Sequence, residues 1–308
     1  MSKKKSAQLF YKYFEEWIAI YKVNAIRSVT LTKYYMTLKW LAKLAPELRL
    51  CDLTRRTYQE LINTYALEHE RQTTLDFHHQ IKGAIMDAVD EGLIKVNPTR
   101  KIIIKGKKPG RKKSKFLSQN QVKLMIQQLD LSTEINWDWY ILLVAKTGLR
   151  FSEALALTPN DFDFDRQTLN ISKTWNYRAT KGGFQPTKNP SSVRKVQIDR
   201  QLAMQFSQLV KDLPKDKSIF VKQRVFNSTV NNHLELICKK AGIPVISIHG
   251  LRHTHASLLL FGGVSIASVA KRLGHANMTT TQNTYLHIIQ ELETQDNDKI
   301  MREMSFLN

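Results

Sequence analysis

Apolar side chains recur at spacings of three and four residues through the first hundred positions, which is the pattern of amphipathic helices. The first stripe holds Leu9, Tyr13, Trp17, Ile20 and Tyr21. Three more stripes follow, at Leu31, Tyr34, Tyr35, Leu38 and Leu41; at Tyr58, Leu61, Ile62 and Tyr65; and at Ile81, Ile85, Ala88 and Val89. Hydroxyl caps from Ser28 onward, a stop at Gly92 and the break at Asn97-Pro98 bound these segments. The pattern predicts a small all-α domain.

The pattern after residue 115 mixes helices with a few short strands. Alternation with a period of two predicts strands over 168–172 and 193–198, and the Gly- and Pro-containing stretch 177–192 predicts a hairpin-rich sheet edge. Ser118 is the expected N-cap of the first helix of this part. Helices are predicted over 121–129, 137–147, 152–157, 200–211, 226–241, 251–261 and 266–273. The fold class expected is therefore mainly α with a small antiparallel sheet, an α+β chain.

The 308 residues are long enough for two domains, and the composition marks the boundary between them. Residues 105–115 contain seven cations among eleven residues and no acid, so this run cannot form a core. We therefore expect a helical domain over 1–104, a basic linker over 105–115 and a second domain over 116–308.

The charge balance points to a polyanionic partner. Lys and Arg total 47 against 27 Asp and Glu, a formal charge of +20. Nucleic acid is the usual partner of such a chain, although a ribosomal or merely basic protein has the same composition. Within the linker we expect the basic side chains to lie against phosphates rather than serve only as a solvated tether; these are Lys107, Lys108, Arg111, Lys112 and Lys113.

Several classes of protein are excluded by composition. Cys51 and Cys238 cannot build a disulfide framework, which indicates a reducing compartment such as the cytoplasm. No secretory signal follows the first residues. The longest apolar clusters, 141–145 and 258–261, are far shorter than the roughly 18 residues that a membrane span needs. Membrane, secreted and disulfide-stabilised proteins are therefore not expected.

Two arginine-containing segments are candidates for anion chemistry. In Thr-Gly-Leu-Arg-Phe-Ser-Glu, at 147–153, Arg150 follows a glycine turn and lies within reach of Glu153; taken alone this pattern also fits a surface ion pair. In His-Gly-Leu-Arg-His-Thr-His-Ala, at 249–256, His249 and Arg252 lie on one side of a helix start, where phosphate binds well. A metal site at His249 and His253 is disfavoured, because no carboxylate completes the ligand set.

Two more segments contain candidate nucleophiles and acids. His275 follows Leu-Gly, and Tyr285, ten residues later, is the only tyrosine after Tyr177; alone it also fits a core aromatic. In the hairpin region Lys181, Lys188 and Lys195 are all candidates for a functional lysine, and the sequence alone does not choose among them.

Together the four segments resemble the ordered signature of the tyrosine recombinases, the phage integrase family, especially integrases of temperate phages and conjugative transposons. The resemblance is carried by Thr-Gly-Leu-Arg-x-x-Glu, by His-Gly-Leu-Arg-His-Thr-His-Ala and by the Leu-Gly-His segment that ends in Thr-Tyr at Tyr285. It covers residues 115–308 closely and residues 7–100 more loosely. It implies an all-α core-binding domain and a mixed catalytic domain that form a C-shaped clamp on DNA.

The resemblance implies a site-specific recombinase that cleaves and rejoins DNA through a 3′-phosphotyrosine. Tyr285 is then the nucleophile, Arg150 and Arg252 bracket the phosphate, and His249 or His275 donates further hydrogen bonds. We expect His249 to be the base, Lys188 the general acid and Glu153 the support of Arg150. One phosphodiester is exchanged for an ester of similar energy, so neither ATP nor a metal cofactor is expected.

The expected partners are double-stranded DNA attachment sites and, on DNA, a homotetramer, with DNA-bending or excision accessory proteins as further candidates. Many phage-type family members have an additional small N-terminal domain that binds arm sites, and the sequence leaves open whether this protein binds such sites. The apolar end of the chain, after Tyr285, is expected to dock on a neighbouring protomer or on its own domain. The alternatives are a type IB topoisomerase, which uses similar chemistry, a DNA-binding regulator, and a metal-dependent nuclease or protease.

Overall fold

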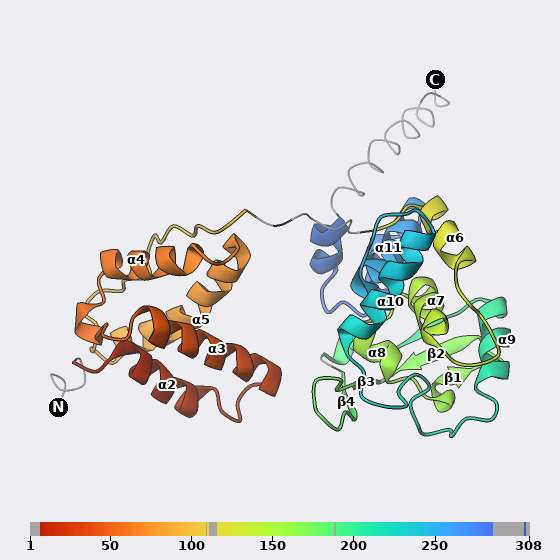
Figure 1. Cartoon of the computed structure of the whole chain (residues 1–308), viewed down its shortest axis with the longest axis horizontal. Coiled ribbons are helices and arrows are strands. Elements are labelled where there is room, and N and C mark those ends of the chain that lie inside the picture. Colours follow the sequence, from red (N-terminus) through yellow and green to blue (C-terminus); the bar gives the residue numbers. More distant parts are fainter. Residues whose placement is uncertain (1–6, 109, 111–115, 188, 286–304, 306–308) are drawn as a thin grey trace. The chain divides into compact units, whose positions relative to one another are not determined.

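The computed structural model describes residues 7–108, 110, 116–187, 189–285 and 305. The chain divides into two compact units, Met1–Lys112 and Lys113–Asn308 (Figure 1). The division falls within the basic stretch that the sequence predicts as a linker. The two units are described separately below.

The N-terminal unit is built from helices that surround one apolar core. Its long helix α5 packs against each of the other three α-helices, and a 3₁₀ turn spans Leu50–Asp52. The α-helices are α2 (Phe10–Tyr21), α3 (Ser28–Leu44), α4 (Arg55–Ala66) and α5 (Arg71–Asp90). The predicted helical character is confirmed, and the stripes expected for α4 and α5 do face the core.

The two ends of the first predicted stripe differ from the structure. Tyr13 and Trp17 are buried as predicted, and Phe14 and Ile18 are fully buried beside them. Ile20 is 71% exposed, Tyr21 is also exposed, and Leu9 lies before the helix, at the N-cap. The hydroxyl cap expected for α3 is also absent, because Ser28 is the first helical residue and the Arg27 side chain makes no capping bond.

The first residues of the predicted linker pair with the N-terminal unit. The Lys107 amide donates to the carbonyl oxygen of His69 at 2.8 Å, and Lys107 forms a parallel bridge with Glu70. Gly106 permits this approach, because a Cβ there would lie 2.2 Å from the Arg71 nitrogen. The exposed Lys107 and Lys108 are therefore attached to the helical unit, while Arg111, Lys112 and Lys113 lie outside the described residues.

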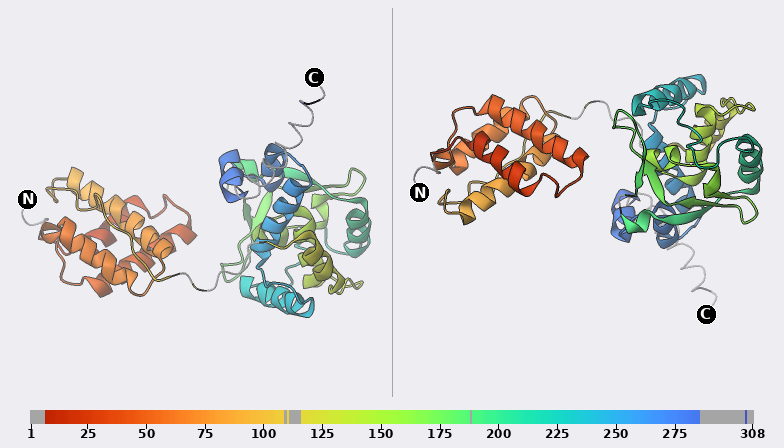
Figure 2. Two further views of the ribbon diagram at one scale, coloured as in Figure 1. Left: turned by 90° about the horizontal axis from the view of Figure 1, so that it is seen from above. Right: turned by 90° about the horizontal axis from the view of Figure 1, so that it is seen from below.

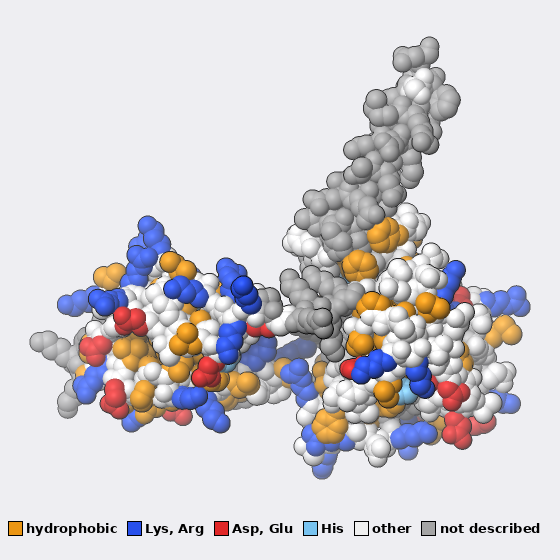
Figure 3. All heavy atoms as spheres, turned by 45° about the horizontal axis from the view of Figure 1, so that its top comes forward, with side chains coloured by type: hydrophobic (Ala, Val, Ile, Leu, Met, Phe, Trp, Pro, Cys, Tyr) orange, Lys and Arg blue, Asp and Glu red, His pale blue; other side chains and the backbone are white. Residues whose placement is uncertain are grey.

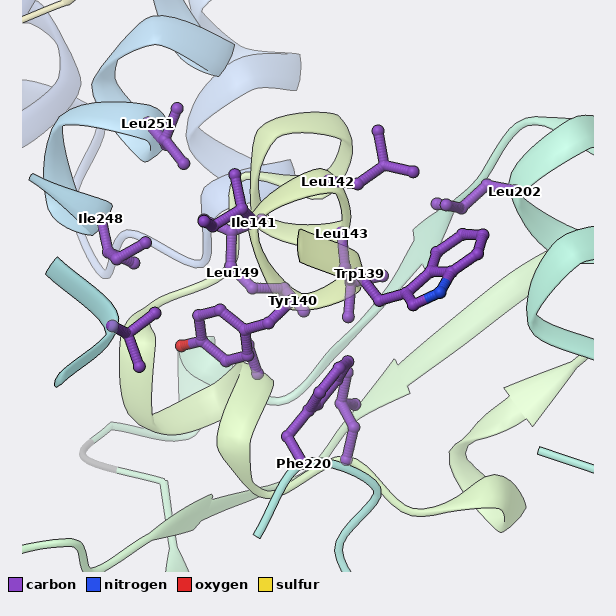
Figure 4. Packing of buried hydrophobic residues seen from close by; sticks show 14 of the residues in the cluster. Trp139, Tyr140, Ile141, Leu142, Leu143, Leu149, Leu202, Phe220, Ile248 and Leu251 are labelled. Carbon is purple, nitrogen blue, oxygen red and sulfur yellow. The ribbon is translucent and has the colours of Figure 1, made fainter. Parts of the chain in front are cut away.

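Helix α7 is the centre of the C-terminal unit. It packs against α8, α10 and α11, and Figure 4 shows Tyr140 and Ile141 of α7 among Leu149, Ile248 and Leu251. The helices are α6 (Gln119–Gln127), α7 (Trp137–Thr147), α8 (Phe151–Leu155), α9 (Arg200–Leu209), α10 (Asn227–Lys240), α11 (Ile248–Phe261) and α12 (Ile266–Leu273), with 3₁₀ turns at Pro159–Asp161 and Pro190–Ser192. Ser118 caps α6 as predicted.

The strands of this unit form two small antiparallel sheets. Three strands pair in the order β1-β2-β5, with Leu169 opposite Val196 and Ile171 opposite Arg194. The predicted hairpin pairs with itself as a separate two-stranded sheet. The bounds are β1 (Phe162–Asp163), β2 (Thr168–Ile171), β3 (Lys173–Trp175), β4 (Phe184–Pro186) and β5 (Arg194–Gln197). Both sheets are visible in the two views of Figure 2, and the α+β class is confirmed.

A buried ion pair ties β5 to α8. Glu153, 1% exposed, accepts hydrogen bonds from Arg194 Nη2 at 2.9 Å and from Arg150 Nη1 at 2.6 Å. Burial alone raises the pKa of Glu153, but the hydrogen bond and charge of Arg194, followed by the charge of Arg150, hold the pKa below its ordinary value. The carboxylate is therefore ionised and joins two arginines from distant parts of the sequence.

Replacement of Arg194 by methionine should destabilise the protein strongly. Removal of one partner leaves the charge of Glu153 buried without its main counter-ion, a change that costs about 3–5 kcal/mol. Denaturant titration measures the free energy of unfolding. The matched control is Arg166→Met, since Arg166 is exposed and lies 3.9 Å from Asp163, and it should change stability by less than about 1 kcal/mol. Equal losses from the two variants would contradict the role of the buried pair.

Candidate active site

Hydrogen bonds connect Arg150 and Arg252 to backbone carbonyl oxygens at two glycine turns. Arg252 Nη1 and Nη2 donate to the carbonyl oxygens of Gly148 and Leu273, both at 2.7 Å. Arg150 Nη2 donates to the Gly274 carbonyl oxygen, 124 residues away in the sequence, at 2.9 Å. The three arginine- and histidine-containing motifs are thereby joined into one cluster.

The glycine turns allow these approaches. Gly148 ends α7 with φ +68°, and a Cβ there would lie 2.7 Å from the His255 ring; Gly274 ends α12 with φ +67°, and a Cβ there would lie 2.9 Å from Arg194. Side chains rarely adopt this left-handed conformation, so glycine suits both positions. Arg150 follows the first turn directly and occupies the N-cap position of α8.

Helix α11 presents its first turns to the same cluster. It begins at Ile248, three residues earlier than predicted, and the Ser247 hydroxyl accepts from the Gly250 amide at 3.1 Å. His249 lies in the first turn with an exposed face. Burial of the rest of the ring, and then the charges of Arg252 and Arg150, lower its pKa below 6.5. His249 is therefore neutral at pH 7 and has one N–H to donate.

The positive charge of the cluster is poorly compensated. Arg252 is 3% exposed, and burial followed by the charge of Arg150 lowers its pKa to about 9. Among the described residues, the carboxylate that lies between these arginines is Glu153, and it already pairs with Arg150 and Arg194. Figure 3 shows how widely Lys and Arg are spread over the faces in view. A bound anion would stabilise Arg252.

His275 lies beside the arginines on the turn after α12. Its Nδ1 is 2.7 Å from the Thr281 hydroxyl. Burial, and then the charges of Arg252, Arg150 and Arg194, lower its pKa to about 4. The ring is therefore neutral at pH 7, and when the hydroxyl donates to Nδ1 the imidazole proton resides on Nε2, where it is available to a ligand.

Tyr285 lies in an apolar cluster at the end of a helical segment, 278–285. It is 2% exposed and packs with Ala256, Leu260, Val269 and Leu273. Burial raises the pKa of its phenol to about 12, against a smaller opposing effect of Arg252. The Tyr285 hydroxyl lies 2.9 Å from His253 Nδ1. The structure thus brings His253, and not the predicted His249, to this phenol.

Hydrogen bonds connect Arg150, Glu153, Arg252 and the turn that holds His275, as the sequence motifs suggested. Lys188 lies outside the described residues, as does the chain after Tyr285 except Ser305. Lys107 and Lys108 belong to the N-terminal unit. The roles of all these residues remain predictions.

Three residues of the cluster were not predicted from the sequence. Arg194 and Val196 share the inward face of β5. The alternation of this strand could therefore have shown that Arg194 is buried, and a buried cation needs a carboxylate partner. His253 was considered only as a metal ligand, although it follows Arg252 directly. Arg272 also joins the cluster, since its Nε donates to His255 Nε2 at 2.9 Å.

The described residues contain neither a metal-binding cluster nor a membrane-spanning helix. No group of three or more His, Cys, Asp or Glu side chains gathers among them in an arrangement that suits a metal ion. No helix in this part of the chain combines the length and apolar character that crossing a bilayer requires.

Solved structures share this fold. The integrase of transposon Tn1549, solved with a circular intermediate DNA, superposes with a TM-score of 0.75 at 17% identity and covers 89% of this chain and 94% of its own. A lambda integrase dimer bound to a core site has a TM-score of 0.65 at 17% identity and covers 89% of this chain and 97% of its own.

Relatives in sequence include bacterial recombinases and transposases. A tyrosine recombinase XerC-like protein of Caldanaerobacter subterraneus is 27% identical over 67% of this chain, and the transposase of transposon Tn916 from Enterococcus faecalis is 25% identical over 77%. The chain spans 60% and 62% of the length of these two relatives. The profile of the phage integrase family matches residues 115–291, more than half of the sequence. The chain belongs to the phage integrase family.

Proposed function

We propose that this protein is a site-specific DNA recombinase that cleaves and rejoins strands through a 3′-phosphotyrosine at Tyr285. The observation that supports it best is the pair of arginines that are hydrogen-bonded to the two glycine turns. Arg150 and Arg252 are held by backbone carbonyls at 2.7 to 2.9 Å, so their positions are set before any ligand binds. Preorganised donors of this kind stabilise a transition state, because no energy is spent on reorganising them.

A phosphodiester is the anion that fits this cluster. Its non-bridging oxygens suit the planar fork of a guanidinium, and they gain negative charge as the phosphorus is attacked. Such a ligand would compensate the charge of Arg252, whose pKa is lowered by burial and then by the charge of Arg150. The neutral rings of His249 and His275 would add hydrogen bonds to the same oxygens.

The chemistry is an exchange of phosphate esters. The Tyr285 oxygen attacks phosphorus, and the 5′-oxygen leaves with a proton from the general acid, for which Lys188 is the residue implied by the resemblance. A 5′-hydroxyl from a second duplex then attacks the phosphotyrosine and releases Tyr285. Bonds of similar energy are exchanged, so this cycle requires no ATP.

Strand exchange between two duplexes needs four nucleophiles, so we infer a homotetramer on double-stranded attachment sites. Each protomer would bind DNA through both of its units, with accessory DNA-bending or excision proteins as further partners. The similarity to the transposase of transposon Tn916 supports a place on a bacterial mobile element, and therefore in the cytoplasm. A type IB topoisomerase is the chemical alternative, and transfer of a strand between two duplexes separates the two activities.

The phenylalanine variant of Tyr285 tests the function directly. Wild-type protein, incubated with supercoiled plasmids that contain randomised inserts, should form a covalent adduct that survives denaturing gel electrophoresis. Tyr285→Phe should bind the recovered sequences with nearly unchanged affinity and form no adduct, because only the nucleophilic hydroxyl is removed. An adduct retained by the variant would show that another residue attacks, and absence of an adduct from the wild type would exclude the proposed reaction.

Lys188→Ala should block cleavage of ordinary DNA. Cleavage by this variant should recover on a substrate with sulfur in place of the bridging 5′-oxygen. The sulfur leaving group needs no proton, so removal of a general acid no longer matters. Single-turnover adduct formation on both substrates gives the comparison. Lys181→Ala and Lys195→Ala are the matched controls, and rescue of either one in place of Lys188→Ala would reassign the acid.

Replacement of the five linker cations by glutamine should weaken binding to all DNA sequences alike. These are Lys107, Lys108, Arg111, Lys112 and Lys113. The slope of log K against log salt concentration should become shallower by about 0.9 for each phosphate that the variant no longer neutralises. Fluorescence anisotropy with specific and random duplexes at several salt concentrations measures this slope. An unchanged slope would mean that the basic stretch is only a tether.

A further inference from the structure

We propose that His253 is the residue that accepts the proton of Tyr285 when the phenol attacks DNA. This inference rests on the proposed function and assigns the proton acceptor of that reaction. From the sequence, we expected this role for His249, one helical turn earlier on α11. The structure supports the change through one contact, the 2.9 Å separation between His253 Nδ1 and the Tyr285 oxygen.

The separation between the two groups suits proton transfer. The His253 and Tyr285 rings meet edge to face, with their centroids 5.8 Å apart and an angle of 61° between their planes. A base must lie within about 2.6–3.2 Å of the oxygen that it deprotonates, and His253 Nδ1 meets that condition. Tyr285 is fixed from its other side by the apolar cluster of α11 and α12. The hydroxyl is therefore held toward His253 before DNA binds.

The environment of Tyr285 makes a proton acceptor necessary. With a pKa raised by burial to about 12, roughly one phenol in 100,000 is ionised at pH 7. Arg252 lowers that pKa only in part. General-base assistance typically contributes about 10²- to 10⁴-fold in rate. A buried tyrosine with a raised pKa depends on this assistance more than an exposed tyrosine does.

The other histidines of the cluster have different contacts. His275 Nδ1 faces the Thr281 hydroxyl at 2.7 Å. His255 lies between the Ala145 carbonyl oxygen at Nδ1 and Arg272 Nε at Nε2. His249 meets the His253 ring edge to face, with the centroids 4.7 Å apart. Titratable groups thus face His253 from its own helix and from the segments packed on it, namely His249, Tyr285 and His275, whose pKa a charge on His253 would lower.

The groups of the proposed reaction account for every proton and bond in the attack of Tyr285 on DNA. His253 starts as a neutral imidazole with its proton on Nε2 and its Nδ1 lone pair toward Tyr285. The phenol proton moves to Nδ1 as the bond between Tyr285 Oη and phosphorus forms and the bond from phosphorus to the 5′-oxygen breaks, and the general acid protonates that oxygen. When a 5′-hydroxyl later attacks the phosphotyrosine, its proton passes to the deprotonated general acid, and the Nδ1 proton returns to the phenolate oxygen as the bond between Tyr285 Oη and phosphorus breaks.

His253→Asn separates proton transfer from hydrogen bonding. Asparagine can place a hydrogen-bonding atom near the former Nδ1 but does not accept a proton. On a nicked duplex made from an insert recovered in the adduct selection, we expect single-turnover cleavage to fall at least about 100-fold. The variant's rate should keep rising with pH, because only phenolate attacks, whereas the wild-type rate should level off. His233→Asn, at a histidine of α10 that bonds Asp138, is the matched control and should cleave at the wild-type rate.

A second measurement is independent of catalysis. Full-length protein labelled with ¹⁵N-histidine, with His253→Asn used to assign the resonance, shows which ring nitrogen is protonated. We expect an unprotonated Nδ1 in the wild type and a shifted Nδ1 signal in Tyr285→Phe. A protonated Nδ1, or wild-type cleavage and pH profile in His253→Asn, would overturn the role of His253 alone. A wild-type protein that forms no adduct would instead contradict the proposed function, and with it this step.

Discussion

The buried carboxylate of Glu153 is the interaction on which the arrangement of the site depends. Its two oxygens accept hydrogen bonds from the Arg194 side chain of β5 and from both the backbone amide and the side chain of Arg150, at the start of α8. Arg194 in turn donates to the Arg272 carbonyl oxygen at the end of α12. Strand, helix and glycine turn are thus positioned through one acid that is almost completely shielded from water. An uncharged residue at 153 would leave two guanidiniums without their shared counter-ion.

In this cluster the one carboxylate is paired inside the protein, whereas part of the positive charge has no counter-ion among the described residues. Glu153 is occupied by two arginines, whereas Arg252 donates its hydrogen bonds to the backbone carbonyl oxygens of Gly148 and Leu273. Carbonyl dipoles orient a guanidinium but do not neutralise it. The low pKa values of His249 and His275 have the same origin, because protonating either ring would add charge beside the arginines after burial has already disfavoured it. A phosphodiester bound here, as proposed above, would supply the negative charge that the cluster lacks.

Local patterns predicted most elements, and contacts that are distant in sequence decided the rest. The helix over 137–147 and its end at Gly148 were predictable, since apolar periodicity and glycine act locally. The buried face of α2 was predictable only in part: Tyr13 and Trp17 are buried, but the exposure of Ile20 and Tyr21 depends on which elements pack against the end of the helix. At the site, Arg150 and Arg252 were marked by their motifs, but Arg194 depended on a partner 41 residues away, Glu153. The contact of Tyr285 with His253 depends on how the segment after α12 packs against α11.

Helix α11 shows why a single turn separates the predicted proton acceptor from the observed contact. Arg252, His253 and His255 point from successive parts of this helix to three different partners: the glycine turns, Tyr285 and α7. With 3.6 residues per turn, His249 and His253 project from the same side, so sequence spacing cannot distinguish them. The distinction comes from Tyr285, whose ring is buried against Ala256 and Leu260, farther along the same helix. A tyrosine packed there reaches His253, whereas His249 remains exposed.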